Sequence, residues 1–566
     1  MSRFCSVVLV ETALTHLDRV FTYAIPDGMA VHVGSAVRAP FRRKRRVGVV
    51  TGLLERADIE RPLPLAAIVG PGLDDETVDL ARWVAGRYLS TLGEALATVL
   101  PQRVAGEEDS VVESGRPHHT GSFDFGTYSR GSALARALQR GGGGFVWRPL
   151  AEEDRARAIV SMAGEAAKRG GVLVLLPEVR VRSAVLTALR DAFAESLGEL
   201  GSHRSARERY RDWLAIQAGA KRIAVGGRAA VFAPMRDLRL IVIDDEGHQS
   251  YKEGRAPRYH ARAVAAERAR RTGATLVLVG VPPSVEARAA TERGPYVLVS
   301  PPRPEERKHR SSVTVIEQGT LVPSAPTLQA AKESLAARRR VVLVTHRGGS
   351  HAGSIAARAV RILAPSKPMQ LDSSSTPADV ARAARSADLI CATPFIAKDL
   401  AVERVGLLGL LDVDAALSQP EYRAHEDTFA TWWRAARWTA DARIFVETAN
   451  ASHPAILALT KWDPDVLYRA EAARRRELGY PPFAALARID VPADRAIEVA
   501  RDVAAAGLEA LGPVEKEGRT VVVARARRRE DLLRALEPLA SRWRAADEPM
   551  RVDVDPWEVF VPKWRS

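Results

Sequence analysis

Residues 240–262 decide the fold, and they read LIVIDDEGHQSYKEGRAPRYHAR. The segment opens with four aliphatic residues and then meets Asp244, Asp245 and Glu246. A short apolar run bounded by charge is typical of a fully buried parallel strand with carboxylates at its C-terminal edge. Because open α/β sheets bind ligands at that edge, the segment predicts a site. The other interpretation is an ordinary buried strand capped by solvated acids.

An acid at such a strand end holds Mg²⁺ in P-loop NTPases, beside phosphates that a glycine-rich loop cradles. No Gly-x-x-x-x-Gly-Lys-Ser/Thr sequence occurs in the 566 residues, so nothing supplies backbone amides, a lysine and a hydroxyl together. We therefore interpret Asp244 and Asp245 as vestigial nucleotide or magnesium ligands. We expect no catalytic residue and no cofactor.

Composition narrows the class of protein. A chain of 566 residues with 46% hydrophobic content exceeds a single core, so several domains are expected. The net charge of +14 favours a polyanionic partner, nucleic acid before membrane. Cys5 and Cys391 are too few for a four-cysteine zinc site or a disulfide framework, which predicts a cytosolic chain without bound metal. We find neither a signal peptide nor an apolar run of about 18 residues, so no membrane span is expected.

A basic run lies between two short apolar strands near the N-terminus. It consists of Arg42, Arg43, Lys44 and Arg45, followed by Arg46. Such a loop is either a solvated surface feature or a clamp for phosphates. We carry the first four cations forward as candidate DNA-binding residues.

Several ordered blocks resemble the PriA family of replication-restart helicases. SYKE at 250–253 and PRYHAR at 257–262 are similar to the block after the family's helicase acids, and LDRVFTY at 17–23 is similar to the start of its 3′-DNA-binding domain. LGYPPF at 478–483 and RVDVDP at 551–556 resemble its C-terminal domain. The resemblance implies a multidomain α/β fold: a β-rich N-terminal DNA-binding domain, two degenerate RecA-like lobes and an α+β C-terminal domain.

The same resemblance implies domain boundaries. We expect a 3′-DNA-binding domain at 1–101, a linker or reduced winged-helix region at 102–144 that carries a short helix at 133–140, a first helicase lobe at 145–302, a second lobe without a zinc module at 303–456, and a C-terminal domain at 457–566.

DNA-binding roles also follow from the resemblance. In the family a Phe-Asp-Tyr triplet forms a pocket for the 3′-terminal nucleotide, and this chain keeps Phe21 and Tyr23 while Thr22 replaces the acid. Aromatic rings can stack a base at about 1–3 kcal/mol. Arg228 remains from the family's Gly-Thr-Arg phosphate contact, now Gly-Gly-Arg.

The departures from the family fall on its motor chemistry. WRPL at 147–150 stands in place of the phosphate loop, and VPPSVE at 281–286 replaces the coupling motif. Trp438 and Asp441 occupy the two arginine-finger positions, and the zinc ligands are missing. Since arginine fingers contribute about 10³–10⁵ in rate, these losses predict a scaffold that does not drive unwinding.

The resulting hypothesis is a replication-restart protein that binds stalled or branched forks and helps to reload the replicative helicase. Because the departures from the family remove its motor residues, we expect this protein not to act as a helicase. Implied partners are forked or single-stranded DNA, single-strand-binding protein, and the replicative helicase or its loader. We expect a monomer in the cytoplasm, associated with the nucleoid. One alternative is a residual ATP-dependent 3′–5′ helicase in which Asp244 and Asp245 still hold Mg²⁺, and another is an interaction protein without a DNA role.

Overall fold

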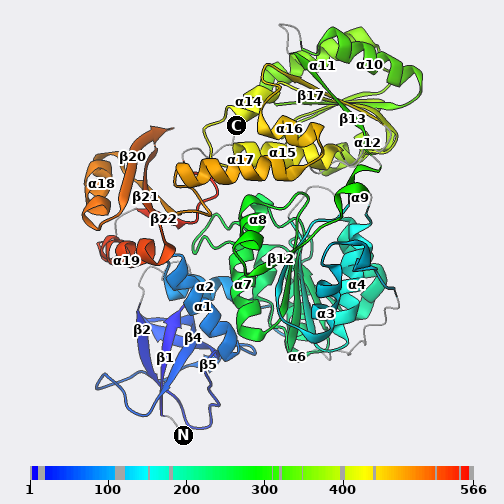
Figure 1. The fold of residues 1–566 in the computed structure, drawn as a ribbon. Coiled ribbons are helices and arrows are strands. Elements are labelled where there is room, and N and C mark those ends of the chain that lie inside the picture. The colour runs from blue at the N-terminus through cyan, green and yellow to red at the C-terminus, as the bar shows by residue number, and fades with distance from the viewer. Residues whose placement is uncertain are drawn as a thin grey trace.

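The computed structural model shows four β-sheets that follow one another along the chain (Figure 1). It describes residues 3–10, 19–108, 121–150, 153–177, 183–308, 310–317, 322–346, 349–394, 402–436, 442–516, 519–546 and 550–559. Within these residues no helix is long and apolar enough to cross a membrane.

The N-terminal domain is an antiparallel sheet with strand order β2-β1-β4-β3-β5. One face buries a small apolar cluster around Cys5 and Tyr23, and the other face packs against two helices. The side chain of Asp74 caps α1, and Thr91 with Glu94 forms a capping box for α2, so both helices begin where the sequence supplies a cap. The elements are β1 (Phe4–Leu9), β2 (Val20–Ala24), β3 (Ala36–Phe41), β4 (Lys44–Leu54), β5 (Ala67–Ile68), α1 (Asp75–Arg87) and α2 (Leu92–Val99).

Lobe 1 is a seven-stranded parallel sheet with the order β12-β6-β11-β10-β7-β9-β8. The predicted strand is its β10 (Leu238–Ile243), which lies between β7 and β11 and is buried apart from Arg239. The remaining elements are α3 (Gly131–Arg140), β6 (Gly144–Trp147), α4 (Arg155–Ala167), β7 (Gly171–Leu175), α5 (Ala184–Phe193), β8 (Leu197–Glu199), α6 (Ala206–Ala218), β9 (Ile223–Gly226), α7 (Ala261–Thr272), β11 (Thr275–Val279), α8 (Val285–Glu292) and β12 (Tyr296–Val299).

The interval predicted to be a linker is partly integrated into lobe 1. In its described second half, α3 covers the predicted helix and buries Leu134 and Leu138 in the lobe's core. Thr275 at the start of β11 donates its hydroxyl to the carbonyl of Ala137 at 3.1 Å. The linker interpretation is therefore wrong for residues 121–144, because their apolar side chains pack against the sheet. Residues 109–120 lie outside the described part of the chain.

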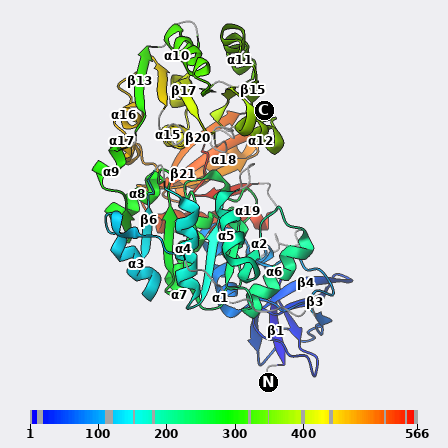
Figure 2. The same ribbon diagram turned by 90° about the vertical axis from the view of Figure 1, so that its right-hand side faces the viewer.

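Lobe 2 is a six-stranded parallel sheet with the order β13-β18-β17-β14-β16-β15. Figures 1 and 2 show it above lobe 1, with α9 (Arg303–Arg307) near the connection. Its elements are β13 (Ser312–Glu317), α10 (Ala325–Ala336), β14 (Arg340–Thr345), α11 (Gly349–Leu363), β15 (Pro368–Leu371), α12 (Pro377–Ser386), β16 (Leu389–Ala392), β17 (Val405–Leu411), α14 (Val413–Leu417), α15 (Ala424–Ala436), β18 (Arg443–Thr448), α16 (Pro454–Thr460) and α17 (Pro464–Glu477).

The C-terminal domain is an antiparallel sheet with the order β20-β21-β19-β22, accompanied by two helices. It contacts the N-terminal domain and both lobes: Arg544 donates to the Leu89 carbonyl at 2.9 Å, Lys252 of lobe 1 pairs with Asp553 at 2.7 Å, and the Val559 amide donates to Glu421 of lobe 2 at 3.0 Å. The multidomain α/β fold expected from the sequence is thus confirmed. The elements are β19 (Ala485–Val491), α18 (Ala496–Ala505), β20 (Glu509–Lys516), β21 (Arg519–Ala526), α19 (Arg529–Ala545) and β22 (Arg551–Val554).

Candidate nucleotide and DNA sites

Three acids stand at the carboxyl end of β10, as the sequence predicts. Asp244 is 2% exposed, Asp245 8% and Glu246 0%. Asp245 adopts a left-handed backbone with φ of 50°. Buried carboxylates need charge partners or hydrogen bonds, so the groups that face these three acids decide what the site can bind.

Each acid already has a partner within the chain. Arg155 at the start of α4 pairs with Asp244 at 2.9 Å, and Arg434 of lobe 2 pairs with Asp245 at 2.6 Å. Burial opposes ionisation of Asp245, but Arg434, His248 and Arg155 together outweigh burial, and the pKa of this carboxyl lies below its usual value. The guanidinium groups of Arg155 and Arg434 therefore lie beside the two carboxylates, where Mg²⁺ would have to bind.

Glu246 serves the structure of lobe 1. It forms an ion pair with Arg262, and Ser284 donates both its amide, at 2.6 Å, and its hydroxyl, at 3.0 Å, to the carboxylate. Burial raises the pKa of Glu246 in spite of these contacts. This acid ties β10 to the segment that leads into α8.

Aromatic side chains fill the position of the phosphate loop after β6. Trp147 is 0% exposed, and its ring lies 5.7–5.9 Å from the rings of Phe123, Phe125 and Tyr128. The Tyr128 hydroxyl accepts a hydrogen bond from the Leu150 amide at 3.1 Å. The Leu150 amide, which could otherwise bind a phosphate, thus donates its hydrogen bond within the protein. Residues 151–152 lie outside the described part of the chain.

The first turn of α4 also disfavours a phosphate. The carboxylate of Asp154 accepts a hydrogen bond from the Arg157 amide at 3.0 Å and so caps the helix. A helix N-terminus is a ready anion site only when its amides are available. With a carboxylate on this terminus and Arg155 committed to Asp244, the described residues do not fit a magnesium nucleotide.

The segment in place of the coupling motif contacts lobe 2. Ser284 caps α8, and the next amide, that of Val285, donates to Glu426 of α15 at 2.8 Å. Glu286 then pairs with Arg423 and lies 3.4 Å from Arg475. Residues whose counterparts in the family couple hydrolysis to movement here hold the lobes together.

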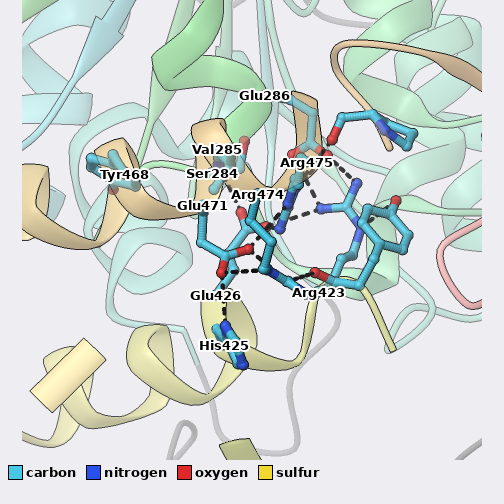
Figure 3. Close-up of polar contacts among 12 residues, drawn as sticks. Ser284, Val285, Glu286, Arg423, His425, Glu426, Tyr468, Glu471, Arg474 and Arg475 are labelled. Carbon is cyan, nitrogen blue, oxygen red and sulfur yellow. Dashed lines mark hydrogen bonds and ion pairs between the residues drawn. The ribbon is translucent and has the colours of Figure 1, made fainter. Parts of the chain in front are cut away.

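These contacts belong to a buried network between the lobes (Figure 3), which we call the interlobe cluster: Glu286, Arg423, Glu426, Glu471 and Arg475. The Arg475 side chain is 0% exposed and pairs with Glu426 at 2.6 Å. Burial by itself would raise the pKa of Glu286, but the neighbouring arginines hold this pKa far below its usual range. Burial likewise opposes ionisation of Glu471, but hydrogen bonds from His425 and Arg474 lower its pKa to about 2.

The candidate DNA-binding cations lie at the tip of the β3–β4 hairpin. Arg42, Arg43, Lys44 and Arg45 are all exposed, and Figure 2 shows this hairpin projecting from the N-terminal domain. Arg42 and Arg43 form the turn with φ of 46° and 63°. Such turns favour Asn-Gly, so two arginines here carry a conformational cost.

The two candidate aromatic residues have different environments. Phe21 is half-buried and meets Phe41 edge to face at 5.2 Å, with Arg42 lying 5.5 Å from the Phe41 ring centre. Tyr23 is 4% exposed and donates its hydroxyl to the Pro40 carbonyl at 3.0 Å. The Tyr23 ring packs the domain's core and is not available to stack a base in this structure, whereas Phe21 and Phe41 lie beside the hairpin cations.

Arg228 also has a structural role. Its guanidinium donates to Glu253 at 2.9 Å and to the Ser250 carbonyl at 3.3 Å. Its charge is already balanced, so we correct its interpretation from a phosphate contact to a residue that orders the loop after β10.

Sequence reasoning missed the partners of the acids. Neither Arg155 nor Arg434 carries a local sequence signal of this role. Their pairing depends on how distant segments pack, because Arg434 lies 189 residues from Asp245. Trp438 and Asp441, at the expected arginine-finger positions, are outside the described residues. Among the described residues no group of three or more His, Cys, Asp or Glu could hold a metal ion.

A buried histidine in lobe 2 predicts acid sensitivity. The Nε2 atom of His346 accepts a hydrogen bond from the Trp432 indole N–H at 2.8 Å. Protonation of this nitrogen would place two N–H donors face to face and break the bond. Burial lowers the pKa of His346 to about 4 from an ordinary 6.5, so stability is fully present above pH 6.5 and is lost as pH falls toward 4. The expected loss is at most roughly 3 kcal/mol.

Thermal unfolding between pH 7 and pH 4 measures this loss. His346→Gln keeps an acceptor without a titrating nitrogen and is expected to flatten the pH dependence in that window. An unchanged profile in the variant would assign the sensitivity elsewhere, for example to His453, whose pKa is also lowered to about 4.

Two family models match the chain. A PriA 3′-DNA-binding domain covers residues 7–101, and the C-terminal domain of primosomal protein N covers residues 476–557. The chain is 28% identical to the probable replication restart protein PriA of Mycobacterium tuberculosis over 89% of this chain and 90% of that one. It is 25% identical to the replication restart protein PriA of Treponema pallidum over 83% and 84% of the two chains.

Solved structures resemble part of the chain more distantly. The RNA-bound Dbp5 of Saccharomyces cerevisiae with ADP BeF3 has 11% identity and a TM-score of 0.41, covering 60% of this chain and 92% of that one. The DEAD-box helicase Mss116 bound to RNA and UDP-BeF has 8% identity and a TM-score of 0.38, covering 61% and 76%.

Two successive parallel-sheet lobes follow a β-rich N-terminal domain that matches a 3′-DNA-binding model, so the chain is a multidomain α/β protein with a domain of DNA-binding type. The two terminal domains match models of PriA and of primosomal protein N, and the relatives that span most of the chain are named PriA. The chain is thus similar to the PriA family at both terminal domains and along most of its length.

Proposed function

We propose that this chain is a replication-restart protein that binds stalled or branched forks and helps to reload the replicative helicase without ATP-driven unwinding. The replication-restart role is inferred from the relatives, which are named replication restart protein PriA and align with this chain over most of their length. The absence of unwinding is the part that this chain's own residues support.

One observation carries the proposal: the acids at the end of β10 are neutralised by the chain's own arginines. A magnesium nucleotide would have to displace Arg155 from Asp244 and Arg434 from Asp245, and both acids are buried. Removing a partner from a buried charge is costly, so nucleotide binding would begin with a large penalty. The capped N-terminus of α4 adds a carboxylate where the phosphates would lie.

The N-terminal domain supports binding to DNA. Its β3–β4 hairpin presents four exposed cations, 42–45, and the Phe21–Phe41 pair lies beside them. Cations contribute affinity through the phosphates, whereas an aromatic ring can stack on an unpaired base. The proposed ligand is therefore branched DNA with an accessible single strand.

Further partners belong to the same proposal. A restart protein without a motor needs single-strand-binding protein to find the fork and the replicative helicase or its loader to act on it. We propose a monomer that works in the cytoplasm at the nucleoid.

The experiment measures fork binding and ATP hydrolysis on the same preparation. Fork affinity is expected to fall steeply with salt, and replacing Arg43, Lys44 and Arg45 by alanine to weaken it roughly tenfold or more and to flatten the salt slope by about 3. The charge-matched control replaces three exposed cations that are already paired within helices, and it is expected to bind as the parent does: Lys168, Arg270 and Arg382.

ATP turnover is expected to stay at background with and without forked DNA. DNA-stimulated turnover that disappears in Asp244→Asn would overturn the proposal in favour of a residual helicase or ATPase. Fork binding that is weak and insensitive to salt would favour an interaction protein without a DNA role.

A further inference from the structure

The two lobes meet through charges that are removed from water. Asp245 and Arg434 join the end of β10 to α15, with side chains 11% and 15% exposed. Glu286 of α8 meets Arg423 just before α15, and Val285 donates its amide to Glu426. Three residues in lobe 1 thus contact three in lobe 2 through charge-assisted bonds, which are about twice as strong as neutral ones.

A second line of contacts runs through α17, which packs on α15 and α16. Arg288 of α8 pairs with Asp465 at 3.1 Å, and Tyr468 donates its hydroxyl to the Pro283 carbonyl. Figure 3 shows Arg475, from the same helix, between Glu286 and Glu426, which come from different lobes. One guanidinium therefore balances a carboxylate from each lobe.

The C-terminal tail connects the lobes a third time. The Trp557 ring stacks on His260 of lobe 1 at 6.0 Å, and the Arg423 guanidinium lies 4.4 Å from the same ring's centre. The Val559 amide donates to Glu421 at 3.0 Å. The tail thus lies against both lobes.

We propose that these contacts hold the two lobes in one closed arrangement without any ligand and, resting on the fork-binding role proposed above, that DNA affinity is independent of nucleotide. Arg434 of lobe 2 pairs directly with Asp245 of lobe 1. A nucleotide bound between the lobes would otherwise have to supply this connection. A ligand shifts a conformational equilibrium only through contacts that differ between its states. Because Arg434 and Asp245 are already paired, a nucleotide gains no additional contact at this position when the lobes are closed.

Opening would expose or strand several charges at once. A hydrogen bond to a charged group changes an equilibrium roughly tenfold to a hundredfold, and separation of the lobes breaks several of them. The closed arrangement is therefore expected to be the main population before any ligand binds. Loss of two such contacts is expected to populate open forms measurably.

The test is a distance distribution between spin labels on the two lobes. Lys168→Cys after α4 and Arg382→Cys on α12 place labels at exposed positions of lobe 1 and lobe 2, and the two native cysteines are buried. We expect one narrow distribution that is unchanged by ATP with Mg²⁺. Arg434→Met combined with Glu286→Gln is expected to broaden this distribution, and Arg434→Met alone is expected to broaden it less.

The control is Arg443→Ala, which removes a solvent-exposed ion pair with Glu333 inside lobe 2 and is expected to leave the distribution narrow. A broad or two-peaked distribution in the parent chain, or a shift on addition of ATP, would overturn the closed arrangement. If the double variant does not fold, an unchanged narrow distribution in folded Arg434→Met is the refuting result.

The two proposals fail separately. A broad parent distribution without ATP turnover refutes the closed arrangement and leaves the restart function intact. A narrow distribution accompanied by DNA-stimulated turnover refutes the motor-free function.

Discussion

Replacing Arg475 by methionine is expected to lower the stability of the lobe interface by about 3–5 kcal/mol. The Arg475 side chain is 0% exposed and pairs with Glu286, Glu426 and Glu471. Methionine fills a similar volume but leaves these carboxylates with one cation fewer in a site that water does not reach. The cost is that of uncompensated buried charge, since a buried pair by itself adds little net stability.

Calorimetry of the full chain measures the effect, as a fall on the order of 10 °C in the transition that includes the lobes. Arg476→Met is the matched control, because Arg476 is the next residue of α17, is exposed, and has its guanidinium 4.4 Å from the centre of the Phe483 ring. Its replacement is expected to cost about 0.5–1 kcal/mol. Equal losses in the two variants would show that the interlobe cluster does not depend on Arg475.

A second substitution tests whether charge is the cause. Adding Glu426→Gln to Arg475→Met removes one of the stranded carboxylates, so the double variant is expected to recover part of the lost stability. If the two losses simply add, packing rather than charge would explain the first result.

Replacing Arg42 and Arg43 by Asn and Gly is expected to stabilise the N-terminal domain while weakening its binding to forked DNA. Both arginines adopt left-handed backbone conformations, which cost an ordinary residue about 1–2 kcal/mol, whereas Asn and Gly suit this turn. Local strain of this kind is retained where a site requires the residue. The gain in stability is expected to be about 1–2 kcal/mol, and the loss in affinity roughly tenfold, with a salt slope lower by about 2.

Hydrogen exchange of β3 and β4 measures the first effect, and fork titration at several salt concentrations measures the second. Arg42→Lys with Arg43→Lys keeps the charge and the backbone strain, so it is expected to change neither. If the Asn-Gly variant is stabilised but binds forked DNA as tightly as the parent, the turn does not contact the DNA.

Much of the fold was predictable because its signals are local. An aliphatic run ending in acids marks β10, and blocks of motif residues place the lobes and both terminal domains in order. The side chains that cause the loss of a phosphate loop are equally local, since Trp147 and Arg148 simply stand where glycine and lysine would be needed.

The candidate sites were less predictable. Tyr23 belongs to a sequence block typical of a DNA-binding pocket, yet its hydroxyl reaches Pro40 across the sheet and its ring is buried. Arg228 looked like an available cation, but the loop after β10 brings Glu253 to it. Whether a side chain is available depends on neighbours that no single stretch of sequence contains.

By itself the sequence determined the class of each domain and the absence of a glycine-lysine phosphate loop, because periodicity and motifs act over a few residues. Only the tertiary structure decided that Asp244 faces Arg155, that Asp245 faces Arg434 across the lobes, and that Arg475 lies between Glu286 and Glu426. These pairings join segments far apart in the chain, and their strength comes from burial that exists only once the lobes have packed together.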